Sequence, residues 1–153
     1  MPVQILEVEE LDAWCGREVG VSDWLDITQE RIDRFAEATE DRQWIHLDAA
    51  RAAVESPYKT TIAHGFLSLA IIPALSWQAF RLEGGFRLRV TYGLNRVRFP
   101  APVPSGARVR ARFSLQDYQP AAWGVQTVWQ ATVEAEGQPK PCVAAEWVTR
   151  YYR

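Results

Sequence analysis

The spacing of hydrophobic positions divides the chain into a helical first half and a strand-rich second half. Between residues 28 and 39, apolar side chains recur every three to four positions, which is the period of an amphipathic α-helix. Thr28 can cap this helix, and Glu30 suits the positive end of its dipole. A second, shorter helix is predicted around residues 48–54. One face of the first helix collects Ile32, Phe35, Ala36 and Thr39.

The longest apolar stretch, residues 62–80, predicts a central buried helix. It is too long for a strand, and it is hydrophobic around its whole circumference, as is typical of a helix enclosed by core. Pro73 lacks the N–H that a helix interior needs, so a kink or a break is expected in the middle. Polar residues interrupt the stretch before it reaches the ~20 residues that span a bilayer, so no membrane segment is predicted.

From residue 84 onward, apolar and polar residues alternate with the period of two that indicates strands. A sheet with one apolar face can wrap around a buried helix, so the expected fold class is α+β, as a single domain over residues 1–153. The edges of such a sheet favour dimerisation. About five strands are expected, at residues 19–27, 87–90, 108–113, 125–133 and 142–151.

Composition narrows the class of protein. Hydrophobic residues make up 48% of the 153 positions and charged residues 24%, as in ordinary globular domains. A net charge of −2 argues against a nucleic-acid binder. The N-terminus has neither a basic start nor a long apolar core, so the protein is expected to be cytoplasmic rather than secreted. The two cysteines, Cys15 and Cys142, form no CxxC motif and are expected to be buried free thiols.

Candidate chemistry begins with the two histidines, which are the only ones in the chain. His46 follows Asp41 by five residues, and an aspartate beside a histidine can orient the ring, tune its basicity and share a bound water with it. Five residues is not a helical spacing, so the two side chains converge only if the connecting loop folds back. The alternative is that Asp41 caps the following helix and His46 lies on the surface.

His64 and Gly65 stand at the start of the long apolar stretch. A helix that begins at Gly65 exposes backbone N–H groups without a partner inside the helix, and the helix dipole favours negative charge there. Such donors can stabilise an enolate or a tetrahedral oxyanion, often by ~3–4 kcal/mol for each donor. The alternative for His64 is a core histidine whose hydrogen bonds are satisfied.

Three motifs follow one another along the chain. The first is Asp41-x4-His46, the second is Thr-Ile-Ala-His-Gly-Phe-Leu at residues 61–67, and the third is Tyr-Gly-Leu-Asn-Arg-Val-Arg-Phe-Pro-Ala-Pro-Val at residues 92–103. In this order and spacing, they resemble the MaoC-like dehydratases, and among these the nodulation-protein-N-like (R)-specific enoyl-CoA hydratases. The resemblance runs from about Thr28 to the C-terminus and is more specific than any one motif.

The resemblance implies a hot-dog fold, in which a curved antiparallel sheet wraps around a long central helix, and usually a homodimer. It also implies the addition of water to a trans-2-enoyl-CoA to give the (R)-3-hydroxyacyl-CoA. No metal or redox cofactor is implied, since coenzyme A enters as part of the substrate. Asp41 and His46 match the family's catalytic pair and would jointly hold the water. Which of them is the base stays open, as do the acyl chain length and the choice between coenzyme A and acyl-carrier-protein thioesters.

Further site residues follow from the same resemblance. Gly65 would supply a backbone N–H to the thioester carbonyl oxygen, and His64 would orient the start of the helix. Asn95 would border the site by supporting the loop that carries Asp41. Ser68 could face the pocket one turn into the helix, although a packed or back-bonded serine is an equal alternative. Candidates for the floor of the acyl tunnel are Phe66, Leu69 and Trp77.

Eight arginines and a single acid, Glu83, lie between Arg81 and Arg112. A planar guanidinium binds phosphate in a bidentate manner, so some of these arginines could hold the phosphates of coenzyme A. Arg96 and Arg98 are the better candidates for that contact. The solvated face of amphipathic strands is the expected place of Arg87, Arg89, Arg108, Arg110 and Arg112.

Three departures from the family pattern concern the approach to the site. Glu40 stands where the family usually has a glycine that permits a positive φ, and Gln43-Trp44 replaces Asn-Pro. Glu40 is expected either to shift the loop or to add a carboxylate near the water. Lys59-Thr60 replaces a small, glycine-rich approach to the helix. These changes bear on rate and substrate fit more than on the type of reaction.

Two other functions fit the same fold. A hot-dog thioesterase would hydrolyse the thioester, and a non-catalytic protein would only bind it. The presence of Asp41, His46 and Gly65 together favours the hydratase, because a binding protein has no need of the catalytic pair.

Overall fold

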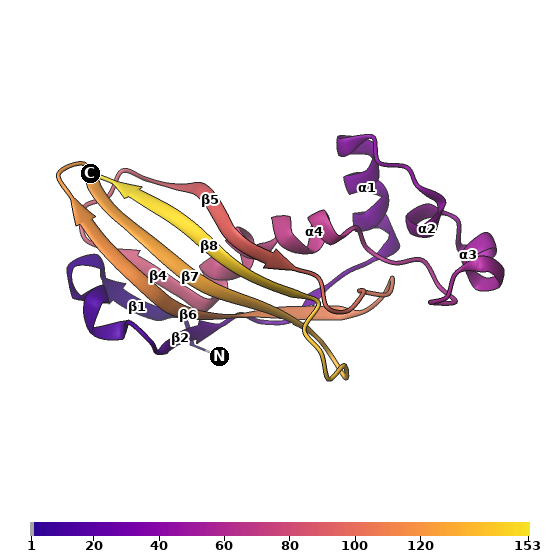
Figure 1. Cartoon of the computed structure of the whole chain (residues 1–153), viewed down its shortest axis with the longest axis horizontal. Coiled ribbons are helices and arrows are strands. Elements are labelled where there is room, and N and C mark those ends of the chain that lie inside the picture. Colours follow the sequence, from indigo (N-terminus) through magenta and orange to yellow (C-terminus); the bar gives the residue numbers. More distant parts are fainter. Residues whose placement is uncertain (1) are drawn as a thin grey trace.

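The computed structural model of the protein describes residues 2–153 and has the predicted α+β class. Its main sheet contains six strands in the order β2-β6-β7-β8-β5, with β3 also paired to β6, and the paired strands are antiparallel. Figure 1 shows the long strands running side by side along the long axis of the molecule. The strands are β2 (Glu18–Val21), β3 (Leu25–Asp26), β5 (Leu88–Arg98), β6 (Arg108–Ala121), β7 (Gly124–Ala135) and β8 (Val143–Tyr152).

The early strand predicted at residues 19–27 is divided into β2 and β3. The division follows from Ser22, whose Oγ accepts a hydrogen bond from the Ala111 N–H at 2.9 Å. The serine side chain thereby competes for a backbone donor of the neighbouring strand, as short polar side chains often do. The other four predicted strands exist: β5, β6 and β7 are longer than predicted, and β8 has the predicted length, shifted by one residue.

The central helix is divided into α4 (Gly65–Ala70) and α5 (Ile72–Ala79). The predicted break exists, but it lies at Ile71, and Pro73 stands in the first turn of α5. A proline is tolerated there because that N–H has no partner within the helix. The expectation of a helix buried on all sides was wrong, since Phe66 is 71% and Trp77 52% exposed.

The helix also ends before residue 80, where strand β4 (Phe80–Glu83) begins. β4 pairs in parallel with the N-terminal strand β1 (Gln4–Glu7), and a 3₁₀ helix, η1 (Val8–Trp14), follows β1. None of these three elements is predicted from the sequence. Four-residue strands and a single 3₁₀ segment are too short to show a hydrophobic period, and this parallel pairing joins segments far apart in the chain.

The core lies between α5 and the inner face of the sheet. Trp129 on β7 is fully buried and stacks on Phe80 with 4.3 Å between ring centroids, and Phe113 on β6 meets Phe80 edge-on at 5.4 Å. The strand β2 approaches α5 closely at Gly20, where a side chain would collide with the carbonyl of Ala79. Each large side chain buried in such a core stabilises the fold by about 1.5–3 kcal/mol relative to an exposed one.

Three helices lie beyond one end of the sheet (Figure 1): α1 (Gln29–Thr39), α2 (Trp44–Leu47) and α3 (Ala49–Glu55). The predicted cap of α1 is confirmed, since Thr28 Oγ1 accepts the Arg31 N–H at 3.1 Å. Asp48 caps α3 in the same way, through the Arg51 N–H at 2.9 Å. None of the helices formed by residues 2–153 has the length and apolar character needed to cross a membrane.

Candidate active site

The loop after α1 folds back and brings Asp41 to both histidines. One possible ligand atom from each of Asp41, His46 and His64 lies within 4.8 Å of the others. Asp41 is exposed, whereas His46 in α2 and His64 at the start of α4 are 6% and 2% exposed. The alternative in which His46 lies on the surface is therefore wrong, and the two motifs that contain the histidines meet in space.

The hydrogen bonding of His46 defines which of its nitrogens carries the proton. His46 Nδ1 lies 2.7 Å from the carbonyl oxygen of Ile62. A carbonyl only accepts, so Nδ1 carries the hydrogen and neutral His46 has its lone pair on Nε2. Burial lowers the pKa of His46 below its ordinary value of 6.5 and outweighs the opposing effects of the Ile62 hydrogen bond and of Asp41. His46 is thus a neutral imidazole with a free basic nitrogen at neutral pH.

The backbone around this pair is unusual at the two positions where the family resemblance called for glycine. Glu40, which ends α1, has φ 63°, and Lys59 has φ 61°. They are the only non-glycine residues at positive φ within residues 2–153. Each costs roughly 1–2 kcal/mol relative to an unstrained residue. The loop therefore keeps the left-handed turn without the glycine, and Glu40 does not displace it into an ordinary conformation.

The start of α4 forms one wall of a cavity of about 240 Å³. Gly65 is the first residue of this helix, and Ser68, one turn further on, is buried and lines the same cavity. The ring of Phe99 lies 3.3 Å from the place that a Cβ at position 65 would occupy. A glycine thus allows the aromatic wall to approach the exposed N–H groups of the helix start.

Three residues of the third motif lie on β5, outside this cavity. Asn95, Arg96 and Arg98 are exposed, and the β5–β8 register is irregular between Leu94 and Val97. Arg98 donates to the carbonyl of Val97 at 2.7 Å. Within residues 2–153, neither arginine has an acidic partner, and no hydrogen bond joins Asn95 to the Asp41 loop. The roles of Asn95, Arg96 and Arg98 stay predictions.

Most other arginines of the basic segment lie where the strand pattern predicted. On the solvated face of β6, Arg108 pairs with Glu136 at 2.5 Å, and Arg110 pairs with Glu134. Arg112 lies 3.3 Å from Glu134 and from Glu18. Because these arginines are already paired with glutamates, their charges are less available to an anionic ligand.

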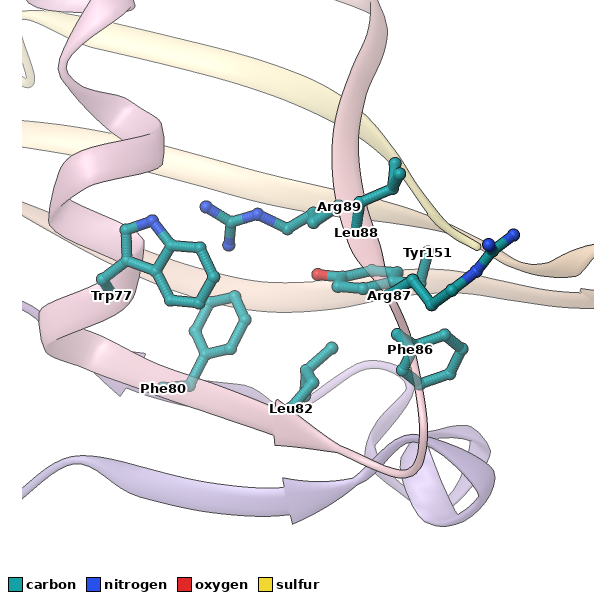
Figure 2. A pocket seen from close by; sticks show the side chains of 8 residues that line it. All are labelled: Trp77, Phe80, Leu82, Phe86, Arg87, Leu88, Arg89 and Tyr151. Carbon is teal, nitrogen blue, oxygen red and sulfur yellow. The ribbon is translucent and has the colours of Figure 1, made fainter. Parts of the chain in front are cut away.

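Arg89 is an exception, because it is half-buried and points away from the solvated face. Its Nη1 donates to Ser76 Oγ at 2.9 Å, and its guanidinium lies 4.0 Å from the centroid of Trp77. Burial lowers the pKa of Arg89. Figure 2 shows it beside Tyr151 in a cavity of about 150 Å³, which is lined by neither the proposed catalytic pair nor Gly65.

The three candidates for an acyl tunnel floor do not share one cavity. Leu69 lines an apolar cavity of about 270 Å³ with Leu94 and Trp147, and Trp77 lines the cavity of Figure 2. Phe66 lines neither of these cavities nor the one at Gly65.

The two cysteines differ in their surroundings. Cys142 is buried beside the Gly65 cavity, and burial raises its pKa to about 11. The expectation for Cys15 was wrong, because it is exposed. It follows η1, the 3₁₀ helix that the hydrophobic pattern did not reveal.

Asp41, His46 and His64 offer atoms that metal ions accept, but the geometry of the rings does not suit a shared ion. The two imidazoles stack with 3.7 Å between centroids and 22° between planes. Nitrogen lone pairs lie in the ring planes, so stacked rings direct them side by side instead of toward one point. Each ring also uses one nitrogen for a backbone carbonyl.

Comparison with known proteins identifies the family. Residues 11–137 match the family of MaoC-like domains. The chain belongs to the MaoC-like family. It is 51% identical to 3-hydroxyacyl-thioester dehydratase Z of Mycobacterium tuberculosis, over 94% of this chain and 95% of that protein. It is 41% identical to Nodulation protein N of Rhizobium leguminosarum bv. viciae, over 94% and 90% of the two chains.

Two solved structures show the same fold. An unliganded (R)-hydratase from Pseudomonas aeruginosa superposes with a TM-score of 0.71 at 25% identity, over 91% of this chain and 82% of that one. An (R)-hydratase from A. caviae gives a TM-score of 0.69 at 24% identity, over 88% and 97%. The predicted hot-dog fold is confirmed, with a sheet wrapped around α4 and α5.

Proposed function

We propose that this MaoC-like protein is a hydratase that adds water to a trans-2-enoyl thioester to give the (R)-3-hydroxyacyl thioester, and catalyses the reverse dehydration. The observation that carries the proposal is the convergence of Asp41 with a buried, neutral His46 beside the start of α4. Support also comes from the 51% identity to a protein named as a 3-hydroxyacyl-thioester dehydratase.

The protonation of His46 suggests how the pair divides its work. Since Nδ1–H is held by Ile62, the lone pair of Nε2 is free to accept a proton from a water that Asp41 also holds. The water oxygen forms a bond to the β-carbon as its O–H bond breaks, and the electrons of the double bond move toward the thioester oxygen. His46 then returns the proton to the α-carbon. Asp41 stabilises the transient imidazolium through its side chain, which lies close to both histidines.

Negative charge develops on the thioester carbonyl oxygen during this addition. Gly65 begins α4 and lines the neighbouring cavity, and its backbone N–H is the proposed donor to that oxygen. Because the charge grows as the β-carbon is attacked, the hydrogen bond strengthens in the transition state and accelerates the reaction. No metal or redox cofactor takes part in the proposed step.

A homodimer and a coenzyme A thioester substrate are further parts of the proposal. Strand β5 is an edge of the sheet, and it exposes apolar side chains that a second copy would cover. The exposed apolar residues of β5 are Leu88, Val90, Tyr92 and Leu94. A monomer at micromolar concentration in light scattering would contradict the dimer.

Arg96 and Arg98 lack acidic partners within residues 2–153, and they are the proposed contacts for the phosphates of coenzyme A. We further propose that the enzyme is cytoplasmic and acts in fatty acid metabolism.

The decisive experiment is hydration of crotonyl-CoA, followed by loss of the enoyl absorbance and chiral analysis of the product. We expect the (R)-3-hydroxy product, and we expect its formation to stop in Asp41→Asn. No turnover of crotonyl-CoA or of a medium-chain enoyl-CoA would refute the proposal. Release of free thiol would then indicate a thioesterase, and its absence a binding protein.

A further inference from the structure

His64 contacts both members of the proposed catalytic pair, Asp41 and His46, although it is not part of the pair. We propose that His64 is a positioning residue that fixes Asp41 through the backbone and His46 through ring stacking, so that the two act on the same water. This inference rests on the proposed hydratase function and adds a third residue to its site. It goes beyond orientation of the helix start, the role that the sequence assigned to His64.

The first contact is a hydrogen bond to the loop. His64 Nε2 lies 2.9 Å from the carbonyl oxygen of Asp41, and since a carbonyl only accepts, Nε2 carries the hydrogen. Asp41 is exposed, and within residues 2–153 its carboxylate accepts a single hydrogen bond, a long one of 3.4 Å from the Gln43 N–H. The loop also leaves Glu40 at positive φ. A donor from the buried side therefore holds the backbone of an exposed residue of the proposed pair, directly after the strained turn at Glu40.

The second contact sets the plane of the His46 ring. The two imidazoles stack at 3.7 Å, and Phe35 lies against His64 at 4.9 Å, so His64 is held between Phe35 and His46. The Ile62 carbonyl fixes the Nδ1 side of His46 within that plane. Together, the stack and the hydrogen bond determine where the Nε2 lone pair points.

The backbone of His64 provides a third connection. It is the N-cap residue of α4, and its carbonyl accepts the N–H groups of Leu67 at 3.0 Å and Ser68 at 3.2 Å. Gly65, the proposed oxyanion donor, is the next residue. A single buried residue thus relates the water-holding pair to the oxyanion donor through rigid contacts.

The other nitrogen of His64 shows that this arrangement has a cost. With the hydrogen on Nε2, Nδ1 is an acceptor, and it is buried without a hydrogen-bond partner in the described part of the chain. An unsatisfied buried polar atom costs about 1–3 kcal/mol. This cost accompanies the tautomer that donates to the Asp41 carbonyl, and a residue that positions Asp41 needs that tautomer. A second base would need a route to the water, and this nitrogen has none.

Two substitutions separate the contacts. His64→Gln keeps a donor near the Nε2 position and loses the ring, whereas His64→Phe keeps a ring for stacking and loses the donor. We expect each to lower kcat about tenfold and His64→Ala about a hundredfold, with KM changed by less than about threefold, because geometry rather than substrate binding is lost. Leu67→Val, a buried change in the same helix, is the control and should keep kcat within about twofold.

A spectroscopic measurement tests the arrangement even if a variant fails to fold. The chain has only two histidines, so the imidazole nitrogen shifts of ¹⁵N-labelled protein can be assigned. We expect opposite tautomers near neutral pH, with the hydrogen on Nδ1 of His46 and on Nε2 of His64. In His64→Phe, the His46 tautomer should persist, because Ile62 still holds it, while turnover falls.

The outcomes are distinct. The positioning role would be overturned if both His64→Gln and His64→Phe turned over as fast as Leu67→Val. It would also be overturned if the nitrogen shifts placed the hydrogen of His64 on Nδ1. A wild-type protein that hydrates no enoyl thioester would instead remove the proposed function, and the nitrogen shifts would still decide whether His64 donates to Asp41.

Discussion

The sheet and the helical end of this molecule are built differently. The helical end comprises α1, α2, α3 and the start of α4. In the sheet, buried side chains alternate with more exposed ones along most of β6, β7 and β8. Charged side chains on these strands pair with one another, as Arg110 does with Glu134. The helical end has short elements, both histidines, and two residues at positive φ, Glu40 and Lys59. The hydrogen bonds of its two imidazoles run to backbone carbonyls.

This difference between the two regions assigns the stability of the fold to the sheet and the proposed chemistry to the helical end. The aromatic core of the sheet supplies the buried apolar area that holds the fold. The helical end contributes less core and tolerates buried imidazoles and backbone strain, which are features of active sites. Substitutions in the sheet should therefore change the free energy of unfolding and leave turnover per folded molecule unchanged, and substitutions at the site should do the reverse.

The largest expected effect is on the catalytic pair. Asp41→Asn and His46→Gln should each lower kcat by ~10²–10⁴-fold, the usual range for a lost acid or base, and leave the melting temperature nearly unchanged. Enoyl-CoA hydration and thermal unfolding measure the two quantities. Asp33→Asn, at an exposed position of α1, is the control. Turnover close to that of this control in both variants would remove the pair from the mechanism.

A core substitution tests the opposite side of the comparison. Phe113→Ala removes a fully buried ring that contacts Phe80, and should lower the free energy of unfolding by about 3–5 kcal/mol. Denaturant unfolding measures this loss. Per folded molecule, kcat should stay within about twofold of wild type. A specific loss of kcat without loss of stability would contradict the proposed separation.

The pH dependence should reveal the buried base. Because burial lowers the pKa of His46, we expect kcat/KM to be constant near neutral pH and to fall in acid with a midpoint below 6.5. The unfolded chain binds a proton at the ordinary value, before the folded protein does. Stability should therefore decline as the pH falls from about 6.5 through the folded pKa, and then level off. His46→Gln should abolish this component, and an unchanged slope in that variant would assign it elsewhere.

The smallest effect concerns the strained turn before Asp41. Glu40→Gly should stabilise the protein by up to about 1 kcal/mol, because glycine adopts positive φ without strain but loses more entropy on folding. Glu40→Ala removes the carboxylate and keeps the strain. Activity that falls in both variants would place the Glu40 carboxylate among the groups that act on the water, contrary to our expectation that kcat stays constant.

The elements with a clear period were predictable from the sequence. Helix α1 with its Thr28 cap and the strands β6, β7 and β8 show periods that local chemistry imposes. The parallel pair β1–β4 was not predictable, because it joins residues 4–7 to residues 80–83 and has no pattern of its own. The expected position of Arg89 was wrong for a related reason, since its partners Ser76 and Trp77 lie on another element.

The site was partly predictable as well. The motif resemblance brought Asp41, His46 and Gly65 to attention, and the structure places them around the start of α4. The contacts of His64 with the Asp41 carbonyl and the His46 ring left no signal in the sequence. A carbonyl acceptor is present at every residue, so only the three-dimensional path of the chain selects it.

The short β1–β4 ladder is expected to loosen before the main sheet does. Of the four residues in β1, only Leu6 is buried, and β4 has no partner other than β1 in the described sheets. The start of β4 is anchored in the core, because Phe80 stacks on Trp129, so local opening should begin at the other end of the strand, at Glu83. Amide hydrogen exchange should therefore be faster at Glu83 than in β7. Hydration that follows this opening should stop at Phe80, at the opposite end of the central helix from Gly65.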